Sequence, residues 1–193
     1  MGNLFLCSYF NAVADRFKEF AKGRKRVCFV ATAAKIEEIN FYVTEAREAL
    51  VKLGFEVYDI DVAKCSKAEF VELLGSCDIL YFSGGNTFYL MDCINNLEVR
   101  DEIKKFLKNN GLYVGESAGA MITAKDIKYV SLMDENSVQM TDFTALGLID
   151  FYVLPHYGEE FFSEICEKIL VDFKNLALKP ISNSEFITTN FCD

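Results

Sequence analysis

The chain has 193 residues, of which 51% are hydrophobic and 25% charged, and its net charge is −9. This length and composition fit a single globular domain over residues 1–193 and exclude a disordered chain. The acidic balance argues against nucleic acid as a partner, because a phosphate backbone selects a basic surface. No apolar stretch approaches the roughly 20 residues of a membrane span, so no membrane partner is expected either.

Seven cysteines and a single histidine are spread along the chain. No two cysteines have C-x-x-C spacing, so a zinc site is not predicted, and we expect neither metal nor cofactor. The amino-terminal residues lack the basic region and cleavage pattern of a secretory signal. Together with an odd number of thiols, this predicts a cytoplasmic protein.

Short apolar runs alternate with segments of helical periodicity. The predicted strands cover residues 4–7, 26–32, 55–60, 78–82, 112–115 and 151–154. The predicted helices cover 12–20, 40–53, 66–74, a segment from about 87, 99–108, 117–124 and 159–173. This alternation predicts an α/β fold of three layers, with a mostly parallel sheet and helices on both faces. Residues 125–151 are less regular, and we expect short strands and loops there and edge strands within 177–189.

The segment Gly115-Glu116-Ser117-Ala118-Gly119 follows the pattern G-x-S-x-G at the end of a predicted strand. This is the sequence form of a nucleophile elbow, in which small flanking residues allow a sharp turn that presents the serine hydroxyl. The helix that follows offers free N–H groups to a developing negative charge. Ser117 is therefore a candidate nucleophile, although so short a pattern also occurs in ordinary turns.

Two further features fall at predicted strand ends. Gly84-Gly85-Asn86 follows one strand, and His156 follows another. Because ligands bind beyond the carboxyl ends of parallel strands, both features are expected on the same edge as Ser117. His156 is the only histidine and hence the candidate general base. Each feature also has an ordinary explanation, since Gly and Asn favour turns and a lone histidine after proline is often a surface residue.

A serine–histidine pair needs a third group to orient the histidine. In hydrolases with this elbow, an acidic residue lies between the serine and the histidine in the chain. The acidic residues in that interval are Asp126, Asp134, Glu135, Asp142 and Asp150. Asp134 is preferred, because it lies in a turn-like segment after a short predicted strand.

Three segments together resemble the peptidase E (aspartyl dipeptidase) family of serine peptidases. They are Tyr81–Phe88, Gly115–Ala120 and Leu154–Tyr157, and they occur in that family's order with similar spacing. The resemblance covers nearly the whole chain. It implies a fold like that of the class I glutamine amidotransferases, with serine where those enzymes have cysteine.

The resemblance also implies roles for individual residues. Ser117 matches the nucleophile and His156 the general base. Gly85 and Ala118 match the residues whose N–H groups form the oxyanion hole. Asp134 matches the third triad member, with Asp126 and Glu116 as alternatives.

One stretch departs from the family. Aspartyl dipeptidases use basic residues after the histidine to hold the substrate's aspartate, whereas Tyr157–Glu164 is acidic here. A preference for Asp-X dipeptides is therefore not expected, and a free amino terminus or a basic group is the alternative hypothesis. We expect Asn86 and Glu116 to contribute to substrate binding, although Glu116 could equally be a solvated residue of the turn.

The sequence thus predicts a serine hydrolase, a dipeptidase or exopeptidase that acts on short peptides. Two alternatives stay open: an esterase or amidase on the same fold, and a non-catalytic protein that binds a small ligand. The resemblance is compatible with a monomer or a small oligomer such as a homodimer.

Overall fold

The computed structural model describes residues 3–192, so the first two residues of the amino-terminal stretch lie outside it. Its central sheet has the strand order β3-β2-β4-β5-β1-β8. These strands are β1 (Leu4–Cys7), β2 (Arg26–Val30), β3 (Glu56–Ile60), β4 (Ile79–Phe82), β5 (Leu112–Glu116) and β8 (Phe186–Thr189). The first five run parallel and β8 pairs antiparallel with β1, which confirms the mostly parallel sheet.

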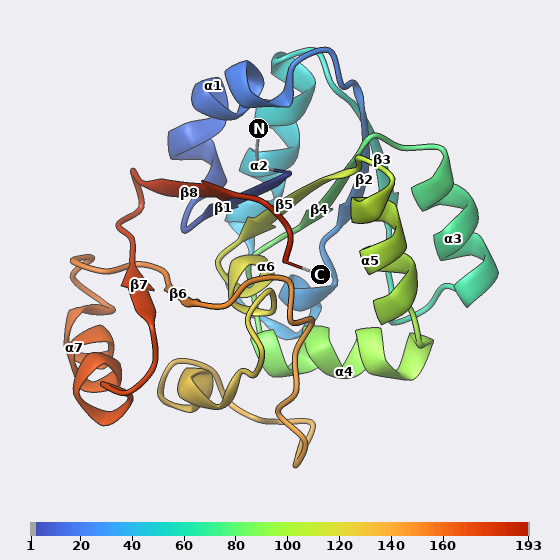
Figure 1. The fold of residues 1–193 in the computed structure, drawn as a ribbon. Coiled ribbons are helices and arrows are strands. Elements are labelled where there is room, and N and C mark those ends of the chain that lie inside the picture. The colour runs from blue at the N-terminus through green and yellow to red at the C-terminus, as the bar shows by residue number, and fades with distance from the viewer. Residues whose placement is uncertain (1–2, 193) are drawn as a thin grey trace.

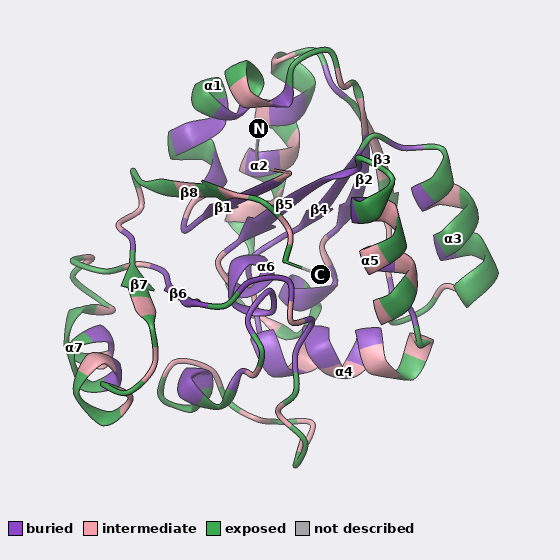
Figure 2. Ribbon diagram, in the orientation of Figure 1, coloured by how far each residue is buried: buried purple, intermediate pink, exposed green. Residues whose placement is uncertain are grey.

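Helices cover both faces of this sheet (Figure 1). They are α1 (Phe10–Ala21), α2 (Phe41–Lys52), α3 (Lys67–Gly75), α4 (Thr87–Leu97), α5 (Arg100–Lys108), α6 (Ala118–Met121) and α7 (Ser163–Asp172), with 3-10 turns η1 (Thr32–Ile36) and η2 (Lys128–Leu132). Buried side chains of α1 and α2 form one core with the sheet, and those of α3 to α7 belong to a second core on the other face. Figure 2 shows the strands between these layers as the most buried part of the molecule.

Burial on both faces explains why the inner strands are apolar throughout. Every residue of β1, β4 and β5 is buried, whereas the edge strands β3 and β8 alternate between exposed and half-buried positions. Except for α7, which begins at Ser163 and not at residue 159, the helices begin within about two residues of the predicted positions. Ser66 and Glu69 form a reciprocal capping box at the start of α3, in which Ser66 Oγ accepts from the Glu69 N–H.

The strand before His156 is not part of the central sheet. β6 (Tyr152–Leu154) pairs in parallel with β7 (Leu178–Pro180) in a separate two-stranded sheet. The predicted short strands within 125–151 are also wrong, because this segment folds as η2 and irregular loops, with one isolated bridge between Asp126 and Thr144. The segment stays irregular because its backbone bonds to loops and helix ends, such as Leu146 N–H to Ile122 O.

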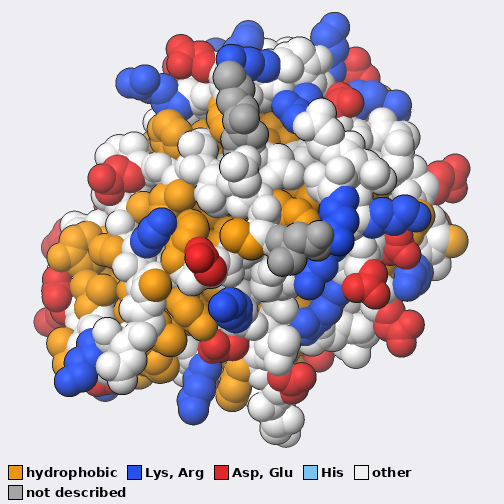
Figure 3. Space-filling model, in the orientation of Figure 1, with side chains coloured by type: hydrophobic (Ala, Val, Ile, Leu, Met, Phe, Trp, Pro, Cys, Tyr) orange, Lys and Arg blue, Asp and Glu red, His pale blue; other side chains and the backbone are white. Residues whose placement is uncertain are grey.

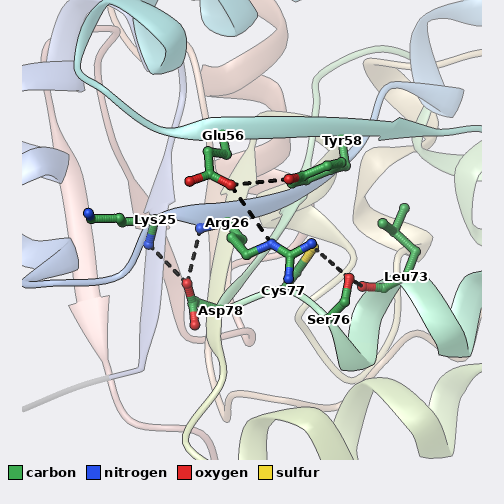
Figure 4. A network of polar contacts seen from close by, with 8 residues as sticks. All are labelled: Lys25, Arg26, Glu56, Tyr58, Leu73, Ser76, Cys77 and Asp78. Atoms are coloured by element: carbon green, nitrogen blue, oxygen red, sulfur yellow. Dashed lines mark hydrogen bonds and ion pairs between the residues drawn. The ribbon is translucent and has the colours of Figure 1, made fainter.

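Polar contacts join the amino ends of β2, β3 and β4 (Figure 4). The elbow lies at the opposite edge of the sheet, where the strands have their carboxyl ends. Asp78 accepts hydrogen bonds from the N–H groups of Lys25 and Arg26, at 2.9 and 3.0 Å. Glu56 approaches the Arg26 guanidinium at 4.0 Å and accepts from the Tyr58 hydroxyl. These contacts align the starts of β2, β3 and β4, so their carboxyl ends stop at one level.

The surface mixes charged and hydrophobic side chains. Figure 3 shows hydrophobic side chains gathered on the part of this face that carries α7, β7 and β8. Val171 of α7 and Phe186 of β8 are among the exposed large hydrophobic residues. Within residues 3–192, no helix combines the length and apolar character needed to cross a bilayer.

Candidate active site

The turn between β5 and α6 has the geometry of a nucleophile elbow. Ser117 adopts φ 47° and ψ −106°, a strained conformation for a residue with a side chain. The turn is fixed because the Ser117 N–H donates to Cys7 O and its carbonyl accepts from Ala120 and Met121, all at 2.9 Å. Ser117 is therefore held at the carboxyl edge of the sheet with its side chain directed away from the strand.

The glycines on either side of Ser117 allow this turn by close backbone contact. A Cβ on Gly115 would lie 2.4 Å from Gly119 O, and a Cβ on Gly119 would lie 2.2 Å from Phe82 O. Both distances are far below van der Waals contact, so neither position accepts a side chain without displacing backbone. The small residues of the G-x-S-x-G pattern are thus required by packing as well as by the turn.

The structure brings His156 to Ser117. Ser117 Oγ lies 2.8 Å from His156 Nε2, within hydrogen-bond reach of a nucleophile and its base. His156 itself has a positive φ of 62°, and its N–H donates to Ser8 Oγ at 3.1 Å. Its ring stacks on Phe162 with 4.6 Å between ring centroids. Backbone, ring face and ring edge are therefore all restrained.

The other ring nitrogen of His156 contacts Asn183. His156 Nδ1 lies 2.7 Å from Asn183 Oδ1, in the loop after β7. An amide oxygen only accepts hydrogen bonds, so Nδ1 carries the proton and Nε2 presents a lone pair to the Ser117 hydroxyl. This is the tautomer that a general base requires.

The expected pairing of Asp134 with His156 is wrong in this structure. Asp134 Oδ2 instead accepts from the Thr87 N–H at 2.7 Å, at the start of α4. The alternative Asp126 accepts from the Tyr152 hydroxyl and the Lys128 N–H. Through the bonds to Thr87 and Tyr152, the two carboxylates connect the irregular 125–151 segment to α4 and β6.

Asp134 nevertheless lies close to the Gly84–Thr87 loop. Burial raises its pKa to about 6, although the hydrogen bond from Thr87 favours the ionised form. The same loop is tied on its other side, where the Asn86 N–H donates to Ala33 O at 2.9 Å. Asp134 therefore supports the loop beside the nucleophile and does not act through His156.

Gly85, the first of the two residues expected to form an oxyanion hole, lies in the loop between β4 and α4. A Cβ on the adjacent Gly84 would be 3.4 Å from Ser117 Cβ, so this loop passes directly over the nucleophile. Gly85 has φ 128° and its α-carbon packs against the backbone of Ala33 and Ala34, where a Cβ would lie 2.3 to 2.5 Å from backbone atoms. Neither the Gly85 nor the Ala118 amide is among the donors of the turn and loop hydrogen bonds within residues 3–192. Both residues lie in segments next to Ser117, and their role as an oxyanion hole stays a prediction.

Asn86 is placed differently from the expectation that it binds substrate. Its side chain is only 5% exposed. Oδ1 accepts from the Tyr89 N–H as the cap of α4, and Nδ2 donates to Glu135 O. With both ends of the amide bonded to the protein, Asn86 anchors the loop and caps α4.

Glu116 is also not a substrate contact, because its side chain is 1% exposed and points beneath the turn. One oxygen accepts from the Phe10 N–H at 2.8 Å, at the start of α1. The other accepts from the Tyr81 hydroxyl of β4, also at 2.8 Å. Glu116 therefore links two elements to the elbow from the inside.

Burial dominates the ionisation of the two titratable groups that flank the nucleophile. It raises the pKa of Glu116 to about 7, against the opposing effect of hydrogen bonds from Phe10, Tyr81 and Gly84. Burial lowers the pKa of His156, while Asn183 and the charge of Glu159 act in the opposite direction. The histidine is therefore poised in its neutral, base-competent form at neutral pH.

Comparison with known proteins places these features in a family. The model of peptidase family S51 matches residues 2–190. The chain belongs to peptidase family S51. This S51 chain is accordingly a serine-type peptidase.

The relatives of this S51 chain match it over most or all of its length. It is 40% identical to the uncharacterized peptidase PM1590 of Pasteurella multocida, with 98% of this chain and 94% of that protein covered. It is 28% identical to peptidase E of Nostoc, over 81% of this chain and 63% of the relative. A solved structure of a candidate peptidase E from Listeria monocytogenes superposes with a TM-score of 0.90 at 37% identity, covering 100% of both chains.

Asn183 is the residue that sequence reasoning missed. The search for a third member was confined to acidic residues between Ser117 and His156. Asn183 lies beyond both and carries no charge. Its local sequence gave no such signal, because Asn183 lies inside the predicted 177–189 segment among other polar residues. Recognising it required knowing that β7 pairs with β6, the strand that delivers His156.

Proposed function

We propose that this chain is a serine dipeptidase or exopeptidase that hydrolyses short peptides. The observation that carries the proposal is the 2.8 Å contact between Ser117 Oγ and His156 Nε2 at a strained elbow. A non-catalytic ligand-binding protein has no need for this contact, because a pocket alone would serve it. Membership of family S51 and relatives named peptidase E support the same conclusion.

In the proposed reaction, Ser117 Oγ attacks the carbonyl carbon of the scissile peptide bond. His156 Nε2 takes the hydroxyl proton, and Asn183 keeps the imidazole in the required tautomer. The Gly85 and Ala118 N–H groups stabilise the negative oxygen of the tetrahedral intermediate. His156 then gives its proton to the leaving amine. Next, a water molecule gives a proton to His156 Nε2 and attacks the acyl carbonyl carbon, and Ser117 leaves as its Oγ takes that proton back from His156.

The substrate class within short peptides is part of the proposal. A curated relative from Drosophila melanogaster, 28% identical, is named probable alpha-aspartyl dipeptidase. The turn after His156 in this chain carries Glu159 and Glu160 and no basic residue. We therefore propose that peptides with an uncharged or basic first residue are preferred over those with an aspartate, because an acidic turn repels a second carboxylate.

The proposed location is the cytoplasm. Seven free cysteines, five of them buried, suit a reducing compartment. A homodimer stays a proposal whose test is the mass of the protein in solution by light scattering.

A fluorophosphonate probe tests the proposed nucleophile. We expect covalent labelling of the native protein at Ser117, since the probe requires an activated serine, and loss of labelling in Ser117→Ala. Mass spectrometry of the digested adduct identifies the modified residue. A folded wild-type protein that stays unlabelled would contradict the proposal.

A substrate panel separates the peptidase from its rivals on the same fold. Dipeptides with Asp, Ala, Leu or Lys first are compared with short acyl esters and simple amides, using Ser117→Ala as the blank for each. Faster turnover of esters or amides than of every dipeptide would favour the esterase or amidase alternative. Fastest turnover of Asp-first dipeptides would contradict the proposed preference.

A further inference from the structure

The group that orients His156 is the neutral amide of Asn183. It therefore carries no negative charge to balance the imidazolium ion that forms during the reaction. When Ser117 gives up its proton, His156 becomes an imidazolium ion. In a triad with a carboxylate, that carboxylate stabilises the imidazolium. Asn183 Oδ1 accepts the Nδ1 hydrogen bond at 2.7 Å, but an amide supplies only a dipole. A nearby negative charge would complete the site.

Glu159 is bonded to both partners of this contact. Its side-chain Oε1 accepts from the Asn183 N–H at 3.2 Å. Its own N–H donates to the His156 carbonyl at 3.1 Å. The residue therefore spans the turn after His156 and the loop after β7, and it brings a carboxylate to the backbone of the residue that orients the ring.

The turn around Glu159 separates His156 from α7 and packs against the histidine. The sequence predicts a helix from residue 159, but α7 begins only at Ser163. The intervening residues wrap around the histidine, where Phe162 stacks on the ring and its N–H donates to Glu159 O at 2.9 Å. Glu159 is only half-buried in this turn, whereas its neighbour Glu160 is exposed.

We propose that Glu159 is a positioning residue of this active site, which holds the Asn183 loop against His156 and supplies the negative charge that Asn183 lacks. This inference rests on the proposed function for its catalytic consequence. Its electrostatic part does not, because the effect of a charge on the ring is measurable without any substrate. The charge of Glu159 favours the protonated ring, in the direction required.

The other ionisable groups around His156 are committed elsewhere. From α7, Glu167 accepts from the Tyr157 hydroxyl, and the Cys166 thiol donates to Pro155 O. From the loop after β7, Glu185 accepts from the Ser182 N–H. From below the elbow, Glu116 is buried against Phe10 and Tyr81. These contacts leave Glu159 as the carboxylate in the turn that bonds directly to the Asn183 segment.

The single histidine makes the test direct. In a protein without a histidine tag, the imidazole signals in an NMR pH titration come from His156 alone. We expect Glu159→Gln to lower the His156 pKa by roughly half a unit to one unit, since an opposite charge in the half-buried turn after His156 has been removed. The glutamine retains an acceptor for the Asn183 N–H, so the loop stays in place while the charge is lost.

Matched variants control the experiment. Glu160→Gln removes the same charge from the adjacent exposed position and is expected to leave the His156 pKa unchanged. Glu159→Asp keeps the charge and is expected to restore most of the shift. An unchanged pKa in Glu159→Gln would overturn the proposal, and so would an equal shift in Glu160→Gln, because the effect would then be a general surface field.

Kinetics add a readout that a purely structural role would not produce. We expect Glu159→Gln to move the acid limb of the kcat/KM profile to lower pH and to reduce the plateau by about 3- to 30-fold, as expected when a charge that stabilises the imidazolium is lost. A lower plateau with an unmoved acid limb would mean that Glu159 only tethers the loop, which would overturn the electrostatic part of the proposal. If no substrate is turned over at all but the NMR shifts are as expected, the proposed function fails while this inference holds.

Discussion

Glu116 is an acid side chain enclosed beneath the nucleophile. Its carboxyl group has exchanged water for three donors, the N–H groups of Phe10 and Gly84 and the Tyr81 hydroxyl. These donors favour the ionised form, yet burial outweighs them and raises the pKa to about 7 from the ordinary glutamate value of 4.5. The folded protein therefore holds this proton more tightly than the unfolded chain does.

This difference predicts how stability depends on pH. An acid whose pKa is raised by folding contributes most below its unfolded value, and the contribution is lost as pH rises through the folded value. The Glu116 contribution should therefore fall between pH 4.5 and about 7, by roughly 3 kcal/mol for a pKa raised from 4.5 to about 7. We expect Glu116→Gln, which cannot ionise, to flatten this fall in urea unfolding measured from pH 4 to 8.

A second carboxyl group serves as the comparison for Glu116. Burial also raises the pKa of Asp134, to about 6, so Asp134→Asn should remove a smaller part of the same pH dependence. An unchanged slope in Glu116→Gln would show that water reaches this carboxyl group in solution.

Asn183, which orients His156, could not be predicted from the sequence. The motifs around Ser117 and His156 could be found because each is local and follows a strand. The third member is distant in sequence, belongs to a two-stranded sheet, and lacks the charge that motif reasoning looks for. Glu116 and Asn86 were located correctly in the chain but assigned to substrate, because sequence position does not reveal which way a side chain points.

At the scale of elements, the alternation of apolar runs with helical segments predicted the order of strands and helices well. The central strands match within about two residues, because burial on both faces leaves them almost entirely apolar, apart from residues at their ends such as Glu116. The prediction failed for 125–151, where polar and apolar residues alternate irregularly and loops satisfy their backbone groups against distant helices. It also extended α7 too early, because Phe162 packs on His156 and not on a helical neighbour.

The packing of α6 on the sheet gives a prediction for an element. Gly119 allows this short helix to approach β4 so closely that an added Cβ would meet Phe82 O at 2.2 Å. We expect Gly119→Ala to lower the free energy of unfolding by about 2 kcal/mol or more, since the backbone of α6 or of β4 would have to shift to make room for the methyl group. It should also abolish activity, because α6 carries Ser117 at its start.

A second glycine provides the matched control for this substitution. Gly75 ends α3 with open space around the position of its missing Cβ. Both variants are compared with the wild type by thermal unfolding. Gly75→Ala should leave the free energy of unfolding unchanged or raise it slightly. Similar destabilisation by both changes would mean that the close approach of α6 to β4 is not what limits residue 119.

At the scale of the whole molecule, the site joins two separately paired layers. The central sheet supplies Ser117, and the small β6–β7 sheet supplies His156 and Asn183. Ser8, only 1% exposed at the end of β1, connects them. Its hydroxyl accepts from the His156 N–H at 3.1 Å and donates to Ile181 O at 3.0 Å. One side chain thus fixes the position of the small sheet relative to the large one.

Ser8→Ala tests this connection. The change leaves a buried donor and a buried acceptor unpaired, which should cost about 1 to 3 kcal/mol in the free energy of unfolding. We expect a larger proportional loss in kcat for peptide hydrolysis, because the small sheet can shift and displace His156 from Ser117. Ser131→Ala, which removes an exposed hydroxyl that bonds to Lys128 O, should affect neither quantity.

The pairing of β1 between β5 and β8 has a consequence for the order of synthesis. Among the described residues, β1 is the first strand in the chain, yet one of its neighbours is β8, the last strand, which ends at Thr189. Asn183 and the Ile181 carbonyl that holds Ser8 emerge equally late. A growing chain can therefore form its elbow before the segment that orients His156 has been made, so the base is assembled only after residue 183 has emerged.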